Sequence, residues 1–191
     1  MDKIQFTNQL LQERRSVYPA SYIDKKIDKE IIQQILENAN RAPTHRFTEP
    51  WRFKVIQGEK RQELGDFLAK KYVKFTPEES FNPLKLKKIS EKCLQADTII
   101  LICMQRDAAE RVPEWEEIAA TSMAVQNMYL TCSAYEIGCY WSSPKSIQFM
   151  NEFCALSDGE VCLGILYLGY YKRLPPLSTR TSIANKVEWL L

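Results

Sequence analysis

The sequence contains one histidine, His45, and its six cysteines include no Cys-x-x-Cys pair. Zinc sites are usually built from clusters of these two residue types, so we expect no metal site. The sequence also lacks a Gly-x-Gly-x-x-Gly run, the loop with which many enzymes bind a dinucleotide phosphate. A nucleophilic cysteine needs a base beside it, and none of the six has one nearby in the sequence. We therefore interpret the thiols as small core residues.

Long apolar runs and a large net charge are missing as well. No run approaches the roughly 20 apolar residues that span a bilayer, and the N-terminus has no apolar signal core. A formal charge of +2 is too small to indicate nucleic acid or an acidic membrane surface as a partner. We therefore expect a cytoplasmic protein with reduced thiols, and we expect its 191 residues to form one domain, 1–191.

The most informative segment is the loop Arg41–Arg52, which reads Arg-Ala-Pro-Thr-His-Arg-Phe-Thr-Glu-Pro-Trp-Arg. Asp28 is placed to cap an amphipathic helix before it, and Pro43 ends that helix because proline lacks a backbone donor. Residues 51–56 then alternate with the period of two that is typical of a strand, with rings and branched chains on the buried face. Cations, hydroxyls and rings in one constrained loop between helix and strand suit an anionic, planar ligand.

The rest of the chain alternates between helical and extended patterns. Residues 114–136 predict a helix with apolar residues on nearly every side, which must be buried all round. In so short a chain this indicates a helix shared between protomers, and Gly138 is predicted to end it as a left-handed cap. The other predicted elements are a helix after Gly58, a flexible insertion at 74–83, a lysine-rich helix at 84–94, a strand at 98–104, a short helix at 145–156 and a strand at 161–168.

A second basic signal, Arg14-Arg15-Ser16, follows a short amphipathic helix at the N-terminus. Two guanidinium groups and a hydroxyl can bind a phosphate through paired hydrogen bonds. Two adjacent arginines at a helix end are, however, usually solvated charge. Without context the pair leaves both interpretations open.

Three segments in this order and spacing resemble the FMN-dependent nitroreductase family, in particular its small, single-domain bacterial branch. They are Arg14-Arg15-Ser16, Arg41-Ala-Pro-Thr-His45 and Glu49-Pro-Trp-Arg-Phe53, and the resemblance continues through the helix 114–136, Gly138-Cys-Tyr-Trp-Ser-Ser-Pro144, the apolar segment 162–170, Arg180 and Val187-Glu-Trp189. The resemblance implies an α+β fold with a central, mainly antiparallel sheet wrapped by helices. It also implies an interlocked homodimer with two FMN sites, in which the C-terminal tail, about 170–191, docks on the partner subunit.

The chemistry that the resemblance implies needs no catalytic side chain. Hydride would pass from NAD(P)H through N5 of FMN to a nitroaromatic, quinone or similar small-molecule acceptor in a ping-pong reaction. The residues expected at the flavin phosphate and the nearby ring edge are Arg14, Arg15, Ser16 and the tail residue Arg180. Those expected around the ring are Arg41, Pro43, Thr44 and His45 from the other protomer, and Tyr140, Trp141 and Ser142 near the dimethylbenzene edge and N5.

Several alternatives stay open at this point. The same fold supports other flavin chemistry, such as reductive dehalogenation or breakdown of the flavin itself, and a non-catalytic flavin-binding or partner-binding protein is a further alternative. His45 is either a flavin contact or an ordinary hydrogen-bonding residue, and Phe75 and Phe81 either contact substrate or pack the insertion onto the core. Glu49 stands where many family members carry glutamine, and Ser178 stands where the larger members carry lysine. We expect Glu49 to point away from the flavin or to pair with an arginine.

Overall fold

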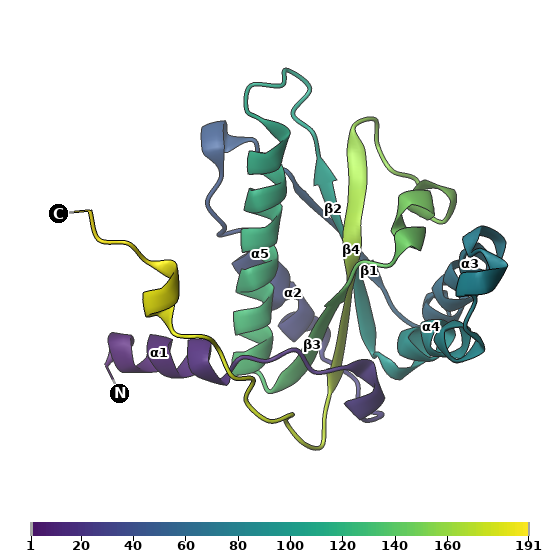
Figure 1. Ribbon diagram of the computed structural model, residues 1–191, viewed down its shortest axis with the longest axis horizontal. Coiled ribbons are helices and arrows are strands. Elements are labelled where there is room, and N and C mark those ends of the chain that lie inside the picture. The colour runs from purple at the N-terminus through teal and green to yellow at the C-terminus, as the bar shows by residue number, and fades with distance from the viewer. Residues whose placement is uncertain (1, 191) are drawn as a thin grey trace.

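Four antiparallel strands form the sheet at the centre of the molecule, in the order β1-β2-β4-β3 (Figure 1). The structure is a computed structural model that describes residues 2–190, so Met1 and Leu191, at the ends of the predicted domain, lie outside the described residues. The strands are β1 (Trp51–Ile56), β2 (Thr98–Gln105), β3 (Ile137–Ser142) and β4 (Glu160–Tyr170). The helices are α1 (Lys3–Glu13), α2 (Lys29–Ala39), α3 (Lys60–Phe75), α4 (Pro83–Gln95) and α5 (Glu114–Ala134), and the short 3-10 turns are η1 (Pro19–Ser21), η2 (His45–Phe47), η3 (Glu78–Ser80), η4 (Lys145–Glu152) and η5 (Ile183–Lys186).

Helices cover both faces of the sheet. Because side chains alternate along a strand, β2 directs Ile100 and Ile102 toward α2 and α5, whereas Ile99 and Leu101 pack with α3, α4 and η4. Both central strands are therefore apolar on both faces, as the sequence predicted. Four of the six cysteines, Cys93, Cys103, Cys132 and Cys139, are buried in these two cores, and all six are free thiols.

Helix α5 has a buried side and an exposed apolar side within one chain. Ala124 and Met128 are fully buried against the sheet. On the other side Trp115 is 67% exposed, and Ile118 and Met123 are exposed as well. The prediction that this helix is buried on all sides is therefore not met by the single chain, and its apolar outer side lacks a cover among residues 2–190.

The segment after α5 differs from the prediction. The helix ends at Ala134, and the left-handed residue beyond it is Glu136, with φ of 55°. Gly138 is not a cap but lies in strand β3, which was not predicted. A Cβ atom on Gly138 would lie 2.5 Å from the ring of Tyr22, so this glycine is required by close packing. A Cβ atom on Gly164 in β4 would lie 1.9 Å from Trp141 Nε1, and this second glycine thereby makes room for an indole of β3.

Two smaller expectations are also wrong. Strand β1 lies at the edge of the sheet, and its branched residue Val55 is exposed instead of buried. The segment predicted as a helix over 145–156 forms the 3-10 turn η4, which ends at Glu152. Both errors concern tertiary structure, which a local pattern does not contain. Val55 is exposed because β1 is an edge strand, and η4 packs on α3.

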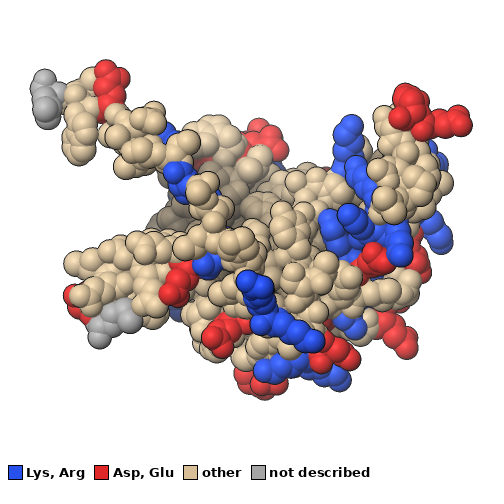
Figure 2. All heavy atoms as spheres, turned by 60° about the horizontal axis from the view of Figure 1, so that its bottom comes forward, with Lys and Arg blue, Asp and Glu red and all other residues tan. Residues whose placement is uncertain are grey.

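Helix α1 and the C-terminal tail project from the body on the same side (Figures 1 and 2). Helix α1 contains no buried residue, although Ile4 and Leu11 are apolar. The tail beyond β4 is exposed nearly throughout, and Trp189 is 80% exposed. Among residues 2–190 no helix has the length and apolar character needed to cross a membrane.

Candidate functional site

Tyr129 of α5 joins three residues of the predicted flavin site. The backbone N–H of Trp141 donates a hydrogen bond of 2.8 Å to the Tyr129 hydroxyl. The Ser16 hydroxyl lies 3.5 Å from the same oxygen, and the Arg14 guanidinium lies 5.3 Å from the Tyr129 ring centroid. The N-terminal segment and the edge strand β3 therefore meet at one buried phenol.

The Tyr129 hydroxyl stays protonated at neutral pH. Burial, with a smaller contribution from the nearby Cys139 thiol, raises the pKa of Tyr129 to about 12. The phenol can therefore accept the Trp141 N–H and still donate a hydrogen bond of its own. Because β3 is an edge strand, this acceptor satisfies a backbone donor that has no neighbouring strand.

Arg14 and Arg15 have the properties that an anion site needs. Among residues 2–190 neither arginine takes part in an ion pair. Arg15 donates from Nη1 to the Glu13 carbonyl, but its Nε is buried without any hydrogen-bond partner. A buried, unpartnered donor is costly unless a ligand supplies the acceptor. The Arg14-Arg15-Ser16 segment thus fits the phosphate end of a flavin mononucleotide.

The loop after α2 is held in an unusual backbone conformation. Arg46, Phe47 and Glu49 have φ of 51°, 52° and 40°, in the left-handed region that non-glycine residues seldom adopt. The Thr44 hydroxyl accepts a hydrogen bond of 3.1 Å from the Glu49 backbone N–H. Arg52 donates to the Glu49 carbonyl oxygen, and no ion pair of the Glu49 carboxylate is found among the described residues. The loop presents Phe47 to solvent with 88% of its surface exposed.

His45 lies at the other end of α5 from the N-terminal arginines. Its Nδ1 is 2.6 Å from Oε2 of Glu116, in the first turn of that helix. Glu116 precedes Tyr129 by 13 positions, which corresponds to roughly 20 Å along an α-helix. Within a single chain, His45 therefore lies far from Ser16 and Arg14.

Arg41 and Pro43 are exposed. The Arg41 side chain lines a shallow surface cavity between α1, α2 and α5, together with Asn38 and Tyr135. Arg180 lies in the exposed tail, where it donates to the hydroxyl of Ser178. The structure does not bring Arg41, Pro43 or Arg180 to the Tyr129 cluster of the same chain.

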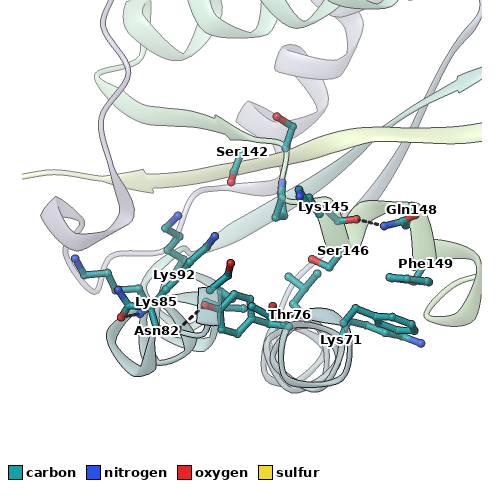
Figure 3. Close-up of a pocket in the computed structure, with 18 of the residues that line it drawn as sticks. Lys71, Thr76, Asn82, Lys85, Lys92, Ser142, Lys145, Ser146, Gln148 and Phe149 are labelled. Carbon is teal, nitrogen blue, oxygen red and sulfur yellow. Dashed lines mark hydrogen bonds between the residues drawn. The ribbon is translucent and has the colours of Figure 1, made fainter. Parts of the chain in front are cut away.

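Alternation along β3 separates the three residues predicted near the flavin ring. Trp141 lies on the α5 face, whereas Tyr140 packs with the core on the other face. The Tyr140 ring lies 4.4 Å from that of Tyr18 and, with Ser142, lines a cavity between α3, α4 and η4 (Figure 3). The end of β3 thus borders both the Tyr129 cluster and an open cavity.

Sequence reasoning missed three residues of this arrangement. The sequence pattern places Tyr129 and Glu116 within a long helix and gives neither a role, and no motif contains Tyr18. Tyr129 could have been found from the sequence, because a tyrosine among the methionines and alanines of a buried helix needs a hydrogen-bond partner for its hydroxyl. No local pattern links Glu116 to His45, which is 71 positions away.

Comparison with known proteins assigns the chain to a family. The model of the Nitroreductase family matches residues 11–170, so the chain belongs to that family. A curated relative named "Putative NAD(P)H nitroreductase YfhC", from Bacillus subtilis, is 30% identical over 183 residues, which cover 93% of this chain and 90% of the relative.

Solved structures have the same fold. A crystal structure of a nitroreductase-like family protein from Bacillus cereus is 31% identical, with a TM-score of 0.81, and the match covers 96% of this chain and 95% of that one. The FMN-dependent nitroreductase NfnB of Mycobacterium smegmatis, solved in complex with NADPH, is 14% identical with a TM-score of 0.77, and the match covers 99% of this chain and 100% of that one. At that identity the likeness concerns the fold alone. The predicted family and the α+β class with an antiparallel sheet are confirmed.

Proposed function

We propose that this protein is an FMN-dependent oxidoreductase that passes electrons from NAD(P)H to nitroaromatic, quinone or similar acceptors in a ping-pong reaction. The observation that carries the proposal is the convergence of Arg14, Ser16 and the β3 edge at Tyr129, next to Arg15. Neither arginine is in an ion pair among residues 2–190, and Arg15 Nε is buried without a hydrogen-bond partner there. Relatives named as NAD(P)H nitroreductases support the same activity.

The residues divide into those that hold FMN and those that shape its surroundings. Arg14, Arg15 and Ser16 would hold the phosphate end by charge-assisted hydrogen bonds. Trp141, positioned by Tyr129, would lie along the ring. Hydride transfer between nicotinamide and acceptor at N5 is the chemistry that a bound FMN would supply. Hydride transfer requires no acid–base pair of side chains. His45, hydrogen-bonded to Glu116, would hold the loop in place and contact the cofactor.

A complete site would require two protomers. His45 is held at the first turn of α5, roughly 20 Å along the helix from Tyr129, and Arg41 lines a separate surface cavity beside the second half of α5. The outer side of α5, helix α1 and the tail all expose apolar residues, and a homodimer would cover them. We therefore propose one nitroreductase domain per chain, with the tail and its Arg180 docked on the partner subunit. A cytoplasmic location is part of the proposal, supported by the six free thiols.

An absorbance spectrum of the purified protein tests the proposal. A flavin spectrum that bleaches when NAD(P)H is added without oxygen, and returns when a nitroaromatic or quinone is added, is the expected result. Protein that holds flavin but does not bleach would be a binder instead of a reductase. Protein that stays colourless after incubation with FMN would refute the cofactor assignment.

A further inference from the structure

A β-bulge places two cysteines opposite each other on the two central strands of the sheet. Ile102 of β2 pairs with Gly164 of β4. The next residue of β2, Cys103, pairs with Cys162, which leaves Leu163 as the extra residue of the bulge. Directly opposite residues of antiparallel strands have Cα atoms about 4.5–5.5 Å apart, and a disulfide requires ~4.4–6.8 Å. The register of the two strands therefore permits a cross-strand disulfide.

Both thiols lie on the same face of the sheet. Cys103 and Cys162 belong to the core that α3, α4 and η4 cover, whereas Leu163 packs with the core on the α5 face. Without the extra residue, Leu163 would stand opposite Cys103. Cys103 is fully buried, and Cys162 is half-buried. Cys162 is therefore the more accessible member of the pair.

The Cys162 thiol is also the more acidic of the two. A hydrogen bond from the Cys103 thiol favours the thiolate form of Cys162 and lowers its pKa, although burial and the Glu160 carboxylate act in the opposite direction. The pKa of Cys103 is raised, because its proton is held in this hydrogen bond and because the thiol is buried. The pair thus combines an accessible thiol that ionises readily with a buried thiol that stays protonated.

A cation lies on the same face of the sheet. Lys54 of β1 forms an ion pair of 2.8 Å with Glu160, which precedes Cys162 by two positions on β4. The positive charge of Lys54 is close enough to favour the Cys162 thiolate. No cation adjoins Cys162 in the sequence, and the fold supplies one from another strand. A role as a small core residue, expected from the sequence, therefore leaves out the surroundings of Cys162.

Other cysteines of the chain lack this combination. Cys154 is half-buried too, but its thiol donates a hydrogen bond of 3.7 Å to the Met150 carbonyl oxygen, and burial raises its pKa. Cys132 and Cys139 also lie together, but both are buried, and burial raises the pKa of Cys139. Neither set offers an accessible, acidic thiol beside a second one.

We propose that Cys162 is an oxidation site for hydrogen peroxide or a small organic hydroperoxide, and that Cys103 converts the oxidised product into a cross-strand disulfide. In the first step RS⁻ + R′OOH + H⁺ → RSOH + R′OH, where RS⁻ is the Cys162 thiolate. A sulfur–oxygen bond forms, the oxygen–oxygen bond breaks, and water or an alcohol leaves. In the second step RSOH + HSR″ → RSSR″ + H₂O, where HSR″ is Cys103. The two sulfur atoms together lose the two electrons that reduce the peroxide.

This site is separate from the proposed flavin site. It lies on the face of the sheet that α3, α4 and η4 cover, opposite the Tyr129 cluster. Neither step requires FMN or NAD(P)H. The reaction with peroxide should therefore be the same with and without added FMN, and it stands or falls independently of the reductase activity.

Peptide mapping of the oxidised protein tests the proposal. Reduced protein is treated with hydrogen peroxide in the absence of NAD(P)H and unfolded, and its remaining thiols are alkylated before mass spectrometry. We expect two of the six thiols to be lost, the peptides of Cys103 and Cys162 to be joined by a disulfide, and dithiothreitol to restore both thiols. A full set of thiols after treatment, or a disulfide between another pair, would overturn the proposal.

Three variants separate the two steps. Cys103→Ala removes the second thiol, so the Cys162 sulfenic acid should persist and be trapped by dimedone. Cys162→Ser should lose thiols to peroxide at least about tenfold more slowly than the wild type. Cys154→Ser is the matched control and should form the disulfide as the wild type does. Dimedone on a cysteine other than Cys162, or unchanged oxidation of Cys162→Ser, would contradict the assignment, and the second result remains decisive if Cys103→Ala does not fold.

Alkylation of the untreated native protein provides a readout without peroxide. Cys162 and Cys154 are both half-buried, but the pKa is lowered for Cys162 and raised for Cys154. Iodoacetamide reacts with the thiolate, so we expect it to modify Cys162 about tenfold faster than Cys154. Equal rates, or faster modification of Cys154, would show that Cys162 is not activated and would overturn the proposal.

Discussion

Replacing Tyr129 by phenylalanine removes one oxygen atom from the point where the N-terminal segment meets β3. The ring and its packing remain, but the Trp141 N–H loses its 2.8 Å acceptor and Ser16 loses its neighbour. A partly buried donor without a partner costs about 1–2 kcal/mol. We therefore expect the free energy of unfolding to fall by about 1–2 kcal/mol, which is roughly a 5- to 30-fold change in the ratio of folded to unfolded protein.

Urea unfolding followed by circular dichroism measures this loss at a fixed protein concentration, since an oligomer's stability depends on concentration. Tyr167→Phe is the control, because among residues 2–190 the buried Tyr167 hydroxyl has a single hydrogen-bond partner, the Cys93 sulfur at 4.0 Å. That variant should lose at most about 0.5 kcal/mol, as expected of a long, weak hydrogen bond to sulfur. Saturating FMN should stabilise Tyr129→Phe less than the wild type if Tyr129 positions the cofactor residues. Equal stability of Tyr129→Phe and the wild type would refute this account of Tyr129.

Four other predictions follow from the site and its surroundings. Arg14→Ala should weaken FMN binding by about 1.5–3 kcal/mol in a fluorescence titration, because a charge-assisted bond is lost, while Lys26→Ala should not. His45→Ala should leave the rate of flavin bleaching by NAD(P)H within tenfold of the wild type at full FMN occupancy, whereas the loss of a true acid or base would cost about a hundredfold. Sedimentation at micromolar concentration should show an obligate dimer, since permanent interfaces bury more than roughly 2,000 Å², and an FMN-loaded monomer would contradict a composite site. Hydrogen bonds from Arg111 lower the pKa of Asp107 from 3.8 to about 2. The stability that the Asp107 carboxylate contributes should therefore be complete above pH ~4 and lost as the pH falls through about 2. In acid unfolding, Asp107→Asn should make the free energy of unfolding less dependent on pH over that range.

The sequence alone predicts those helices and strands whose patterns depend only on neighbouring residues. The helix ending before Pro43 lies where the pattern predicted it, and the strand predicted at 98–104 is β2, Thr98–Gln105. Strand β3 was missed because its sequence, Ile-Gly-Cys-Tyr-Trp-Ser, is short and glycine-containing, and pairing with β4 decides its conformation. The sequence predicted a cap at Gly138. Its actual role depends on the ring of Tyr22, 116 positions earlier, which cannot be inferred from neighbouring residues.

Residues of the candidate site could be predicted from the sequence, but their arrangement in space could not. Arg14 and Ser16 were identified by their resemblance to a motif, but their contact with Tyr129 joins segments 113 positions apart. The distance between this cluster and His45 follows from the length of α5, and no motif contains it. The cavity beside Tyr140 is lined by residues of α3, α4 and η4, so it appears only when the chain is folded.

The close contact between Gly164 and Trp141 links the evolution of two distant positions. A Cβ atom at 164 would overlap the indole, at 1.9 Å from Nε1 and 2.7 Å from Cδ1, so position 164 cannot gain a side chain while tryptophan remains at 141. Among homologous sequences, alanine or any larger residue at 164 should therefore occur only with a smaller side chain than tryptophan at 141. The tryptophan ring at the edge of the candidate site can therefore be inherited only while the central sheet keeps a glycine at 164.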